Sequence, residues 1–176
     1  EDYSFIKRAL EYRFKIKHTA ATYIFNDYED VRDWYTNFTP QDEFFWGRYR
    51  NHLLTHEKLN INSVNILESE TLMNLMNCLG NPNDEFEGQR LRSGLVIGDV
   101  QSGKTANYTG LICKAVDSGY KVVVLLTGTI ERLRQQTQQR IDEGFVGVDS
   151  DAMMKQKDDK RIIGVGKYDP IHPMSL

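Results

Sequence analysis

A run of small and charged residues at positions 98–105 has the composition and spacing of a loop that binds phosphate. It reads Gly98, Asp99, Val100, Gln101, Ser102, Gly103, Lys104 and Thr105, which fits G-x-x-x-x-G-K-[ST] at every position. The two glycines let the backbone curl, so that successive N–H groups point at phosphate oxygens. Lys104 would place a positive charge on the β- and γ-phosphates, and the Thr105 hydroxyl would be a ligand of Mg²⁺. The pattern predicts a nucleotide and magnesium site with Lys104 and Thr105 as its catalytic residues.

The segments around this loop predict a parallel α/β sheet. Apolar runs typical of buried strands lie at 91–98, 120–129 and 161–168, and helical patterns that end at a glycine lie at 103–119 and 130–144. An alternation of strand and helix at these lengths indicates βαβ units. We therefore expect residues 83–176 to form the first βαβαβ part of a RecA-like P-loop domain.

Residues 1–82 are expected to form a helical subdomain that leads into this sheet. One helix is predicted to begin with Thr39 as its N-cap and Pro40 in its first turn. A second helix is predicted from the apolar repeat at 62–80. The turn-forming residues at 80–88 then predict a linker between the two halves.

A turn after the second predicted strand is a candidate nucleic-acid contact. Thr127, Gly128 and Thr129 would offer hydroxyls and free amides at a helix N-terminus, which suits a phosphate group. Arg132 and Gln136 follow on the same helix. By spacing alone, an ordinary N-cap on a solvated helix fits this turn equally well.

Gln89 is a further candidate for the nucleotide site. It lies just before the first predicted strand, where a glutamine could contact the adenine ring. A surface glutamine is the simpler interpretation of that position.

The stretch GLVIGDVQSGKTANYTGLICKAVDSGYKVVVLLTGTIERLRQQTQQRI resembles the bacterial Z-one domain family of proposed endonucleases, which occur with superfamily II helicase ATPases. The upstream stretches FFWGRYRNHL and NSVNILESETLMNLMNCLGNP also resemble that family, and the resemblance covers about residues 40–145. It implies an ATP-dependent hydrolase of restriction or phage-defence type that acts on DNA, alongside protein partners of a defence system. Gly98 to Thr105 would be the nucleotide loop, and Thr127 to Gln136 the first nucleic-acid motif.

Parts of a complete motor or nuclease are missing from this sequence. No predicted strand ends in the paired acids that would hold magnesium and orient the attacking water, and positioning of metal and water carries most of the catalysis. No Glu-x-Lys occurs, and the only Asp-x-Lys, at 158–160, has the character of a solvated charge run. We therefore expect the chain to be the N-terminal portion of a larger ATPase, inactive alone, with any nuclease outside it.

Composition limits the other function classes. The net charge of −3 means that any nucleic-acid contact must come from a local patch. No apolar run approaches the roughly 18 residues that span a bilayer, so we expect a cytoplasmic protein without a membrane partner. Cys78 and Cys113 are expected to be reduced core thiols. The pair His56 and Glu57, interpreted as lacking the second histidine of a zinc helix, is assigned no role.

Two alternatives to a DNA motor remain open. The chain could be a P-loop switch that binds nucleotide without DNA-stimulated turnover. It could also be a helical protein-interaction module with a vestigial P-loop. The alternation of apolar and basic residues at 11–18 could offer a basic face to nucleic acid, although a half-buried element is the simpler interpretation.

Overall fold

Helices build the described part of the molecule. The computed structural model describes residues 33–38, 40, 42–84, 92–97, 103–155 and 161–168. Its elements in chain order are α2 (Phe44–Thr55), α3 (Ile61–Ile66), η1 (Leu67–Leu72), α4 (Met73–Cys78), α5 (Lys104–Asp117), α6 (Glu131–Ile141), η2 (Asp142–Val146), α7 (Ser150–Lys155) and η3 (Gly164–Lys167). Two of them, η1 and η2, are π-helical turns that continue the neighbouring α-helices, and η3 is a 3₁₀ turn. Within these ranges, no helix is long and apolar enough to cross a membrane.

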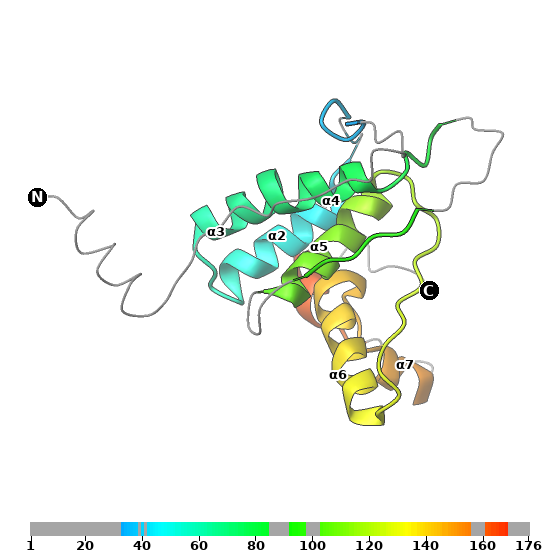
Figure 1. The fold of residues 1–176 in the computed structure, drawn as a ribbon. Coiled ribbons are helices and arrows are strands. Elements are labelled where there is room, and N and C mark those ends of the chain that lie inside the picture. Colours follow the sequence, from blue (N-terminus) through cyan, green and yellow to red (C-terminus); the bar gives the residue numbers. More distant parts are fainter. Residues whose placement is uncertain are drawn as a thin grey trace, which may run out of the picture.

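The central layer is formed by α2 and α5, with the row α3–η1–α4 packed across both (Figure 1). Their shared core contains Trp46, Tyr49 and Leu53 from α2, Val64, Leu67 and Leu72 from the row, and Cys113 from α5. Cys113 is fully buried, as its apolar setting predicted. Helices from both sides of the predicted boundary between residues 82 and 83 therefore contribute to one core.

A glycine allows α5 to approach this row closely. A Cβ atom at Gly110 would lie 2.8 Å from Cδ1 of Leu72 and 3.2 Å from Cζ3 of Trp46. The first distance is shorter than real Cβ contacts, so any larger residue would push the helices apart.

The N-terminus of α2 is capped by a residue of α5. The Asp117 carboxylate accepts hydrogen bonds from the backbone N–H groups of Phe45 and Trp46, at 3.0 and 2.9 Å. These N–H groups belong to the first turn, which has no partner within its own helix. The prediction that this helix begins at Thr39 and Pro40 is therefore wrong: α2 begins at Phe44, where the acceptor from α5 is available.

A buried ammonium group links the three helical segments. The Lys114 side chain of α5 is 5% exposed, and its Nζ lies 3.3 Å from Oε1 of both Glu43 and Glu68. It also lies 4.9 Å from the centre of the Trp46 ring. Burial lowers the pKa of Lys114, but Tyr35, Glu43 and Glu68 outweigh that effect and raise it above its usual value. The group therefore stays charged and holds α5 against both α2 and η1.

The predicted parallel sheet is wrong. Residues 92–97 and 121–128 have no regular secondary structure and pair with no other described segment, and the apolar side chains of both runs are exposed. Leu95 and Ile97 are 85% and 86% exposed, and Leu126 is 88% exposed. A strand is stabilised by the neighbour with which it pairs, and the described residues supply none for either run.

The third predicted strand, 161–168, is also wrong. Ile162 makes a single antiparallel bridge to Val148, after which the chain turns into η3. Gly164 has a φ of 46°, and a Cβ there would lie 1.9 Å from the carbonyl oxygen of Glu143. Only glycine fits so close to the η2 backbone, and this conformation ends any strand.

We predict that Glu68→Gln lowers the free energy of unfolding by about 2 kcal/mol, the range of hydrogen bonds to charged groups. Glu68 accepts from Nε1 of Trp46 at 2.6 Å and forms ion pairs with Lys114 and Arg50. The amide keeps an acceptor for the indole but loses both ion pairs. Chemical denaturation measures the change.

The matched control is Glu70→Gln, because Glu70 is exposed on the same π-helical turn. We expect its effect to stay within about 0.5 kcal/mol. Equal effects of the two substitutions would contradict the importance of the Lys114 network.

Candidate phosphate-binding site

The predicted phosphate loop leads into the N-terminus of α5. Gly103 is the N-cap, with a φ of 77° in the left-handed region that glycine adopts without penalty. The first backbone hydrogen bond of the helix runs from Asn107 N to Gly103 O, at 3.1 Å. The N–H groups of Lys104, Thr105 and Ala106 precede it and have no acceptor within the helix. These donors, together with the exposed Lys104 side chain, make an arrangement that fits a phosphate group.

The rest of the predicted nucleotide site lies outside the described residues. This holds for Gly98, Asp99, Val100, Gln101, Ser102 and Gln89. Their predicted contacts with the nucleotide stay predictions.

An arginine from α6 reaches the threonine of this loop. Nη1 of Arg140 donates a hydrogen bond to Oγ1 of Thr105 at 3.0 Å. The contact brings a second positive charge to the start of α5, which the sequence analysis did not predict. It also occupies the oxygen that was predicted to bind Mg²⁺. The residues therefore fit a phosphate group as they stand, whereas magnesium ligation by Thr105 requires Arg140 to turn away.

The predicted nucleic-acid turn lies at the opposite end of α6. Residues Thr127 to Thr129 are exposed, as are Arg132 and Gln136 on the helix. The N-cap of α6 is Ile130, with no side-chain cap, so neither threonine caps the helix. With a rise of about 1.5 Å per residue, Arg132 and Arg140 are separated by on the order of 12 Å along the axis. The candidate nucleic-acid contact near the start of α6 and the candidate phosphate site at the start of α5 are therefore separate sites.

Two arginines near this turn differ in their surroundings. Arg134 donates to both carboxylate oxygens of Glu131, at 2.9 and 2.7 Å, and Gln135 donates to the same side chain. These bonds, first of all the one from Arg134, lower the pKa of Glu131 to about 2. Glu131 thus neutralises Arg134, which makes Arg132 the better candidate for a phosphate contact.

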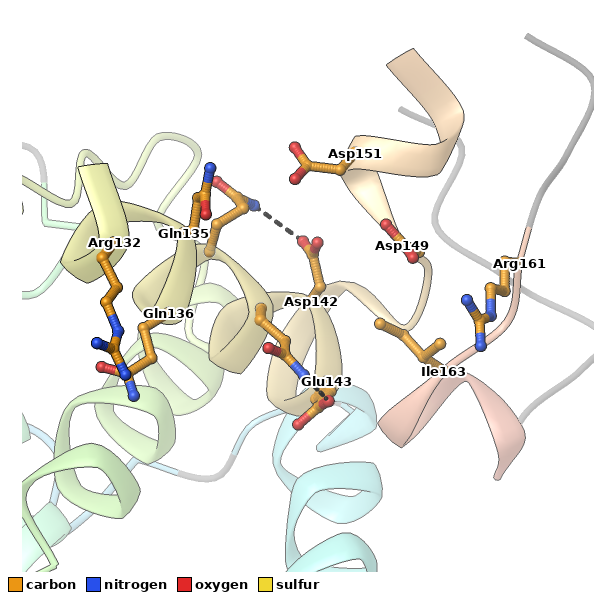
Figure 2. Close-up of a pocket in the computed structure, with 11 residues that line it drawn as sticks. Arg132, Gln135, Gln136, Asp142, Glu143, Asp149, Asp151, Arg161 and Ile163 are labelled. Atoms are coloured by element: carbon orange, nitrogen blue, oxygen red, sulfur yellow. Dashed lines mark hydrogen bonds between the residues drawn. The ribbon is translucent and has the colours of Figure 1, made fainter. Parts of the chain in front are cut away.

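The depression beside α6 is acidic (Figure 2). It has a volume of about 480 Å³, and its charged lining consists of Arg132, Asp142, Glu143, Asp149, Asp151 and Arg161. Four carboxylates against two guanidinium groups repel a nucleic-acid backbone. A DNA contact through Arg132 or Gln136, which also line the depression, would have to lie toward the 127–129 turn.

The acids of this depression have structural roles. Asp142 is buried and accepts hydrogen bonds from the backbone N–H and hydroxyl of Ser150, at 3.0 and 2.7 Å, and from Gln138. Asp149 accepts from the N–H of Ala152 at 3.0 Å in the first turn of α7. Asp142 and Asp149 thus order the start of a short helix.

A histidine pair on α2 escaped the sequence analysis. His52 lies four residues before His56, and both lie with Glu57 at the C-terminal end of α2. The interpretation of His56 and Glu57 considered the second histidine of a zinc helix, which would follow them, whereas His52 precedes them. The signal was present in the sequence, because residues four apart share one face of a helix.

Comparison of the chain with protein-family models, with curated proteins and with solved structures found no match. Assignment of a function therefore depends on the residues themselves.

We predict that Arg140→Ala lowers the affinity of the full-length protein for MgATP by about tenfold, which is about 1.4 kcal/mol. The substitution removes the guanidinium that contacts Thr105 at the start of α5. Fluorescence titration with a labelled ATP analogue measures the affinity.

Arg134→Ala is the matched control, because it removes the same charge from the same helix but from a residue paired with Glu131. The affinity of the Arg134→Ala variant for MgATP should stay close to that of the wild type. An unchanged affinity in Arg140→Ala would remove Arg140 from the nucleotide site.

Proposed function

We propose that this chain is the nucleotide-binding portion of a helicase-like ATPase that acts on DNA. One observation carries the nucleotide part: α5 has no acidic residue in its first turn, and cationic side chains stand there instead. Lys104 is the first residue of the helix, and Arg140 contacts the second. Cations are unfavourable at a helix N-terminus, where the macrodipole is positive, unless an anion binds between them.

Each residue would have a distinct task toward the nucleotide. The N–H groups at the start of α5 would donate to phosphate oxygens, and Lys104 would neutralise the β- and γ-phosphates. Thr105 would hold Mg²⁺ once Arg140 turns from its hydroxyl toward the phosphates. Bound MgATP would supply the free energy that the protein uses. This part of the proposal does not depend on a parallel sheet, because the helix N-terminus itself provides the donors.

The DNA part of the proposal is supported by the turn before α6 and by the resemblance to the Z-one domain family. The exposed hydroxyls of Thr127 and Thr129 lie beside the uncapped start of α6, with Arg132 in its first turn. Such groups suit backbone phosphates, which position a protein on DNA without reading its sequence. A cytoplasmic role in restriction or phage defence, with further protein partners, follows from the resemblance.

A nucleotide-dependent switch without DNA is the second candidate. The acidic depression beside α6 favours it, because a nucleic-acid backbone would be repelled along most of that surface. DNA-stimulated ATP hydrolysis by the full-length protein distinguishes the two candidates.

We predict that Lys104→Ala abolishes ATP-dependent activity of the full-length protein while its fold is retained. Lys104 is exposed, and its expected role is to place charge at the phosphates rather than to shape the loop. ATP hydrolysis is the assay, and circular dichroism checks the fold.

The control is Lys121→Ala, which removes an exposed lysine from the segment after α5. Wild-type turnover in a folded Lys104→Ala variant would refute the nucleotide site.

We predict that the double variant Thr129→Ala, Arg132→Ala weakens DNA binding about equally for all sequences. Loss of one phosphate contact should lower the slope of log affinity against log salt by about one unit. A salt titration of DNA affinity with the full-length protein measures both quantities, and nucleotide affinity should hardly change.

The double variant Arg134→Ala, Thr137→Ala is the control, because it removes the same residue types from positions within α6. Its threonine hydroxyl donates to a carbonyl within α6, and its arginine is paired with Glu131. If both double variants change the slope equally, total charge and not a specific contact governs DNA binding, and the 127–129 turn is then an ordinary helix start.

A further inference from the structure

Three side chains at the end of α2 converge in a way that the proposed nucleotide function does not use. His52, His56 and Glu57 each present a potential ligand atom, and these atoms all lie within 4.8 Å of one another. We propose that they bind a divalent transition-metal ion, with Zn²⁺ as the ion that fits them best.

The spacing along the helix places the ligands together. His52 and His56 are four residues apart, and their rings stack at a centroid distance of 4.8 Å with an interplanar angle of 13°. The N–H groups of His56 and Glu57 both donate to the carbonyl oxygen of His52, at 2.9 and 3.1 Å. This bifurcated closure of the last turn puts Glu57 beside the histidine face and not on the opposite side of the helix.

The cluster is close to the dimensions of a metal site. Tetrahedral Zn²⁺ with ligand bonds of about 2.0–2.1 Å separates its ligand atoms by roughly 3.3 Å. Nε2 of His52 and Oε1 of Glu57 are already 3.8 Å apart. His56 and Glu57 are exposed, so rotation of their side chains can close the remaining gap while His52 stays in place.

His52 is buried with one ring nitrogen unsatisfied. The residue is 3% exposed, and its Nδ1 has no hydrogen-bond partner among the described residues. Imidazole is the commonest metal ligand among protein side chains, and either ring nitrogen can serve.

The electrostatic surroundings favour a cation. The C-terminus of a helix carries partial negative charge, and α2 has twelve residues, enough for a developed dipole. The carboxylate of Glu57 adds negative charge directly at the cluster, 3.8 Å from Nε2 of His52.

The ligand types select the class of ion. Two imidazoles and one carboxylate suit Zn²⁺ and its neighbours Co²⁺, Ni²⁺ and Cu²⁺, whereas Mg²⁺ and Ca²⁺ prefer sites built from oxygen alone. Three protein ligands leave a fourth position of a tetrahedral ion for water or another oxygen ligand. A site of this composition at the surface is thus open to exchange with solvent.

The test is calorimetric titration of the metal-free full-length protein with Zn²⁺, repeated with a variant in which His18 and His172 are both alanine. That background removes the other two histidines of the 176-residue sequence. We expect the substitutions at His18 and His172 to leave the Zn²⁺ affinity unchanged. His56→Ala and Glu57→Ala, made in that background, should each lower the affinity by more than about 100-fold, the upper range for loss of an outer-shell partner.

Glu70→Gln is the matched control, because it removes an exposed carboxylate of η1 that is not part of the cluster, and it should leave the affinity unchanged. His52→Ala can unfold the protein because His52 is buried, so the exposed His56 and Glu57 variants decide the result. Visible absorption of the Co²⁺-loaded protein provides a second measurement, which should change in His56→Ala. Retention of wild-type affinity by either exposed variant would overturn the proposal, as would absence of Zn²⁺ binding in the His18 and His172 background.

Discussion

The buried ammonium group of Lys114 is the constraint on which the arrangement of the helices depends. A charged group that is 5% exposed can be accommodated only if ion pairs and hydrogen bonds replace its hydration. Glu43 precedes α2 and Glu68 lies in η1, so satisfying one cation fixes α5 against two separate elements. The neighbouring Asp117 ties the same end of α5 to the start of α2 through two backbone N–H groups. These polar contacts specify the position of α5, and the apolar core around Trp46 and Cys113 stabilises it.

This anchoring is concentrated in one half of α5. The buried residues of the helix run from Thr109 to Ala115, whereas Lys104 at its start is exposed. The C-terminal half of α5 is thus fixed in the core, and its N-terminus is exposed. An anion bound there would meet donors whose direction is already set by the core, and such preorganisation reduces the entropic cost of binding.

Local patterns of the sequence predicted helices well and the sheet badly. The helix that begins at Lys104 could be predicted from Gly103 and the pattern after it. The cap of α2 by Asp117 could not be predicted, because Asp117 lies more than 70 residues from the start of α2 in the chain. The runs at 92–97 and 121–128 have β-branched residues but form no strand, because a sheet also needs a paired neighbour, which no local pattern specifies. The histidine pair was within reach of a search for ligands four residues apart. Arg140 was not, because only the fold brings it to Thr105.

The N-termini of the three long helices show why α5 is the one suited to an anion. The start of α2 receives the carboxylate of Asp117, and the first turn of α6 contains Glu131. Both of these helices therefore have a negative group near the positive end of the macrodipole. At the start of α5 stand Lys104 and the guanidinium of Arg140, which the dipole disfavours. Among the described residues, this helix end combines N–H groups that have no acceptor within the helix with two cations, an arrangement that an external anion such as a phosphate group would stabilise.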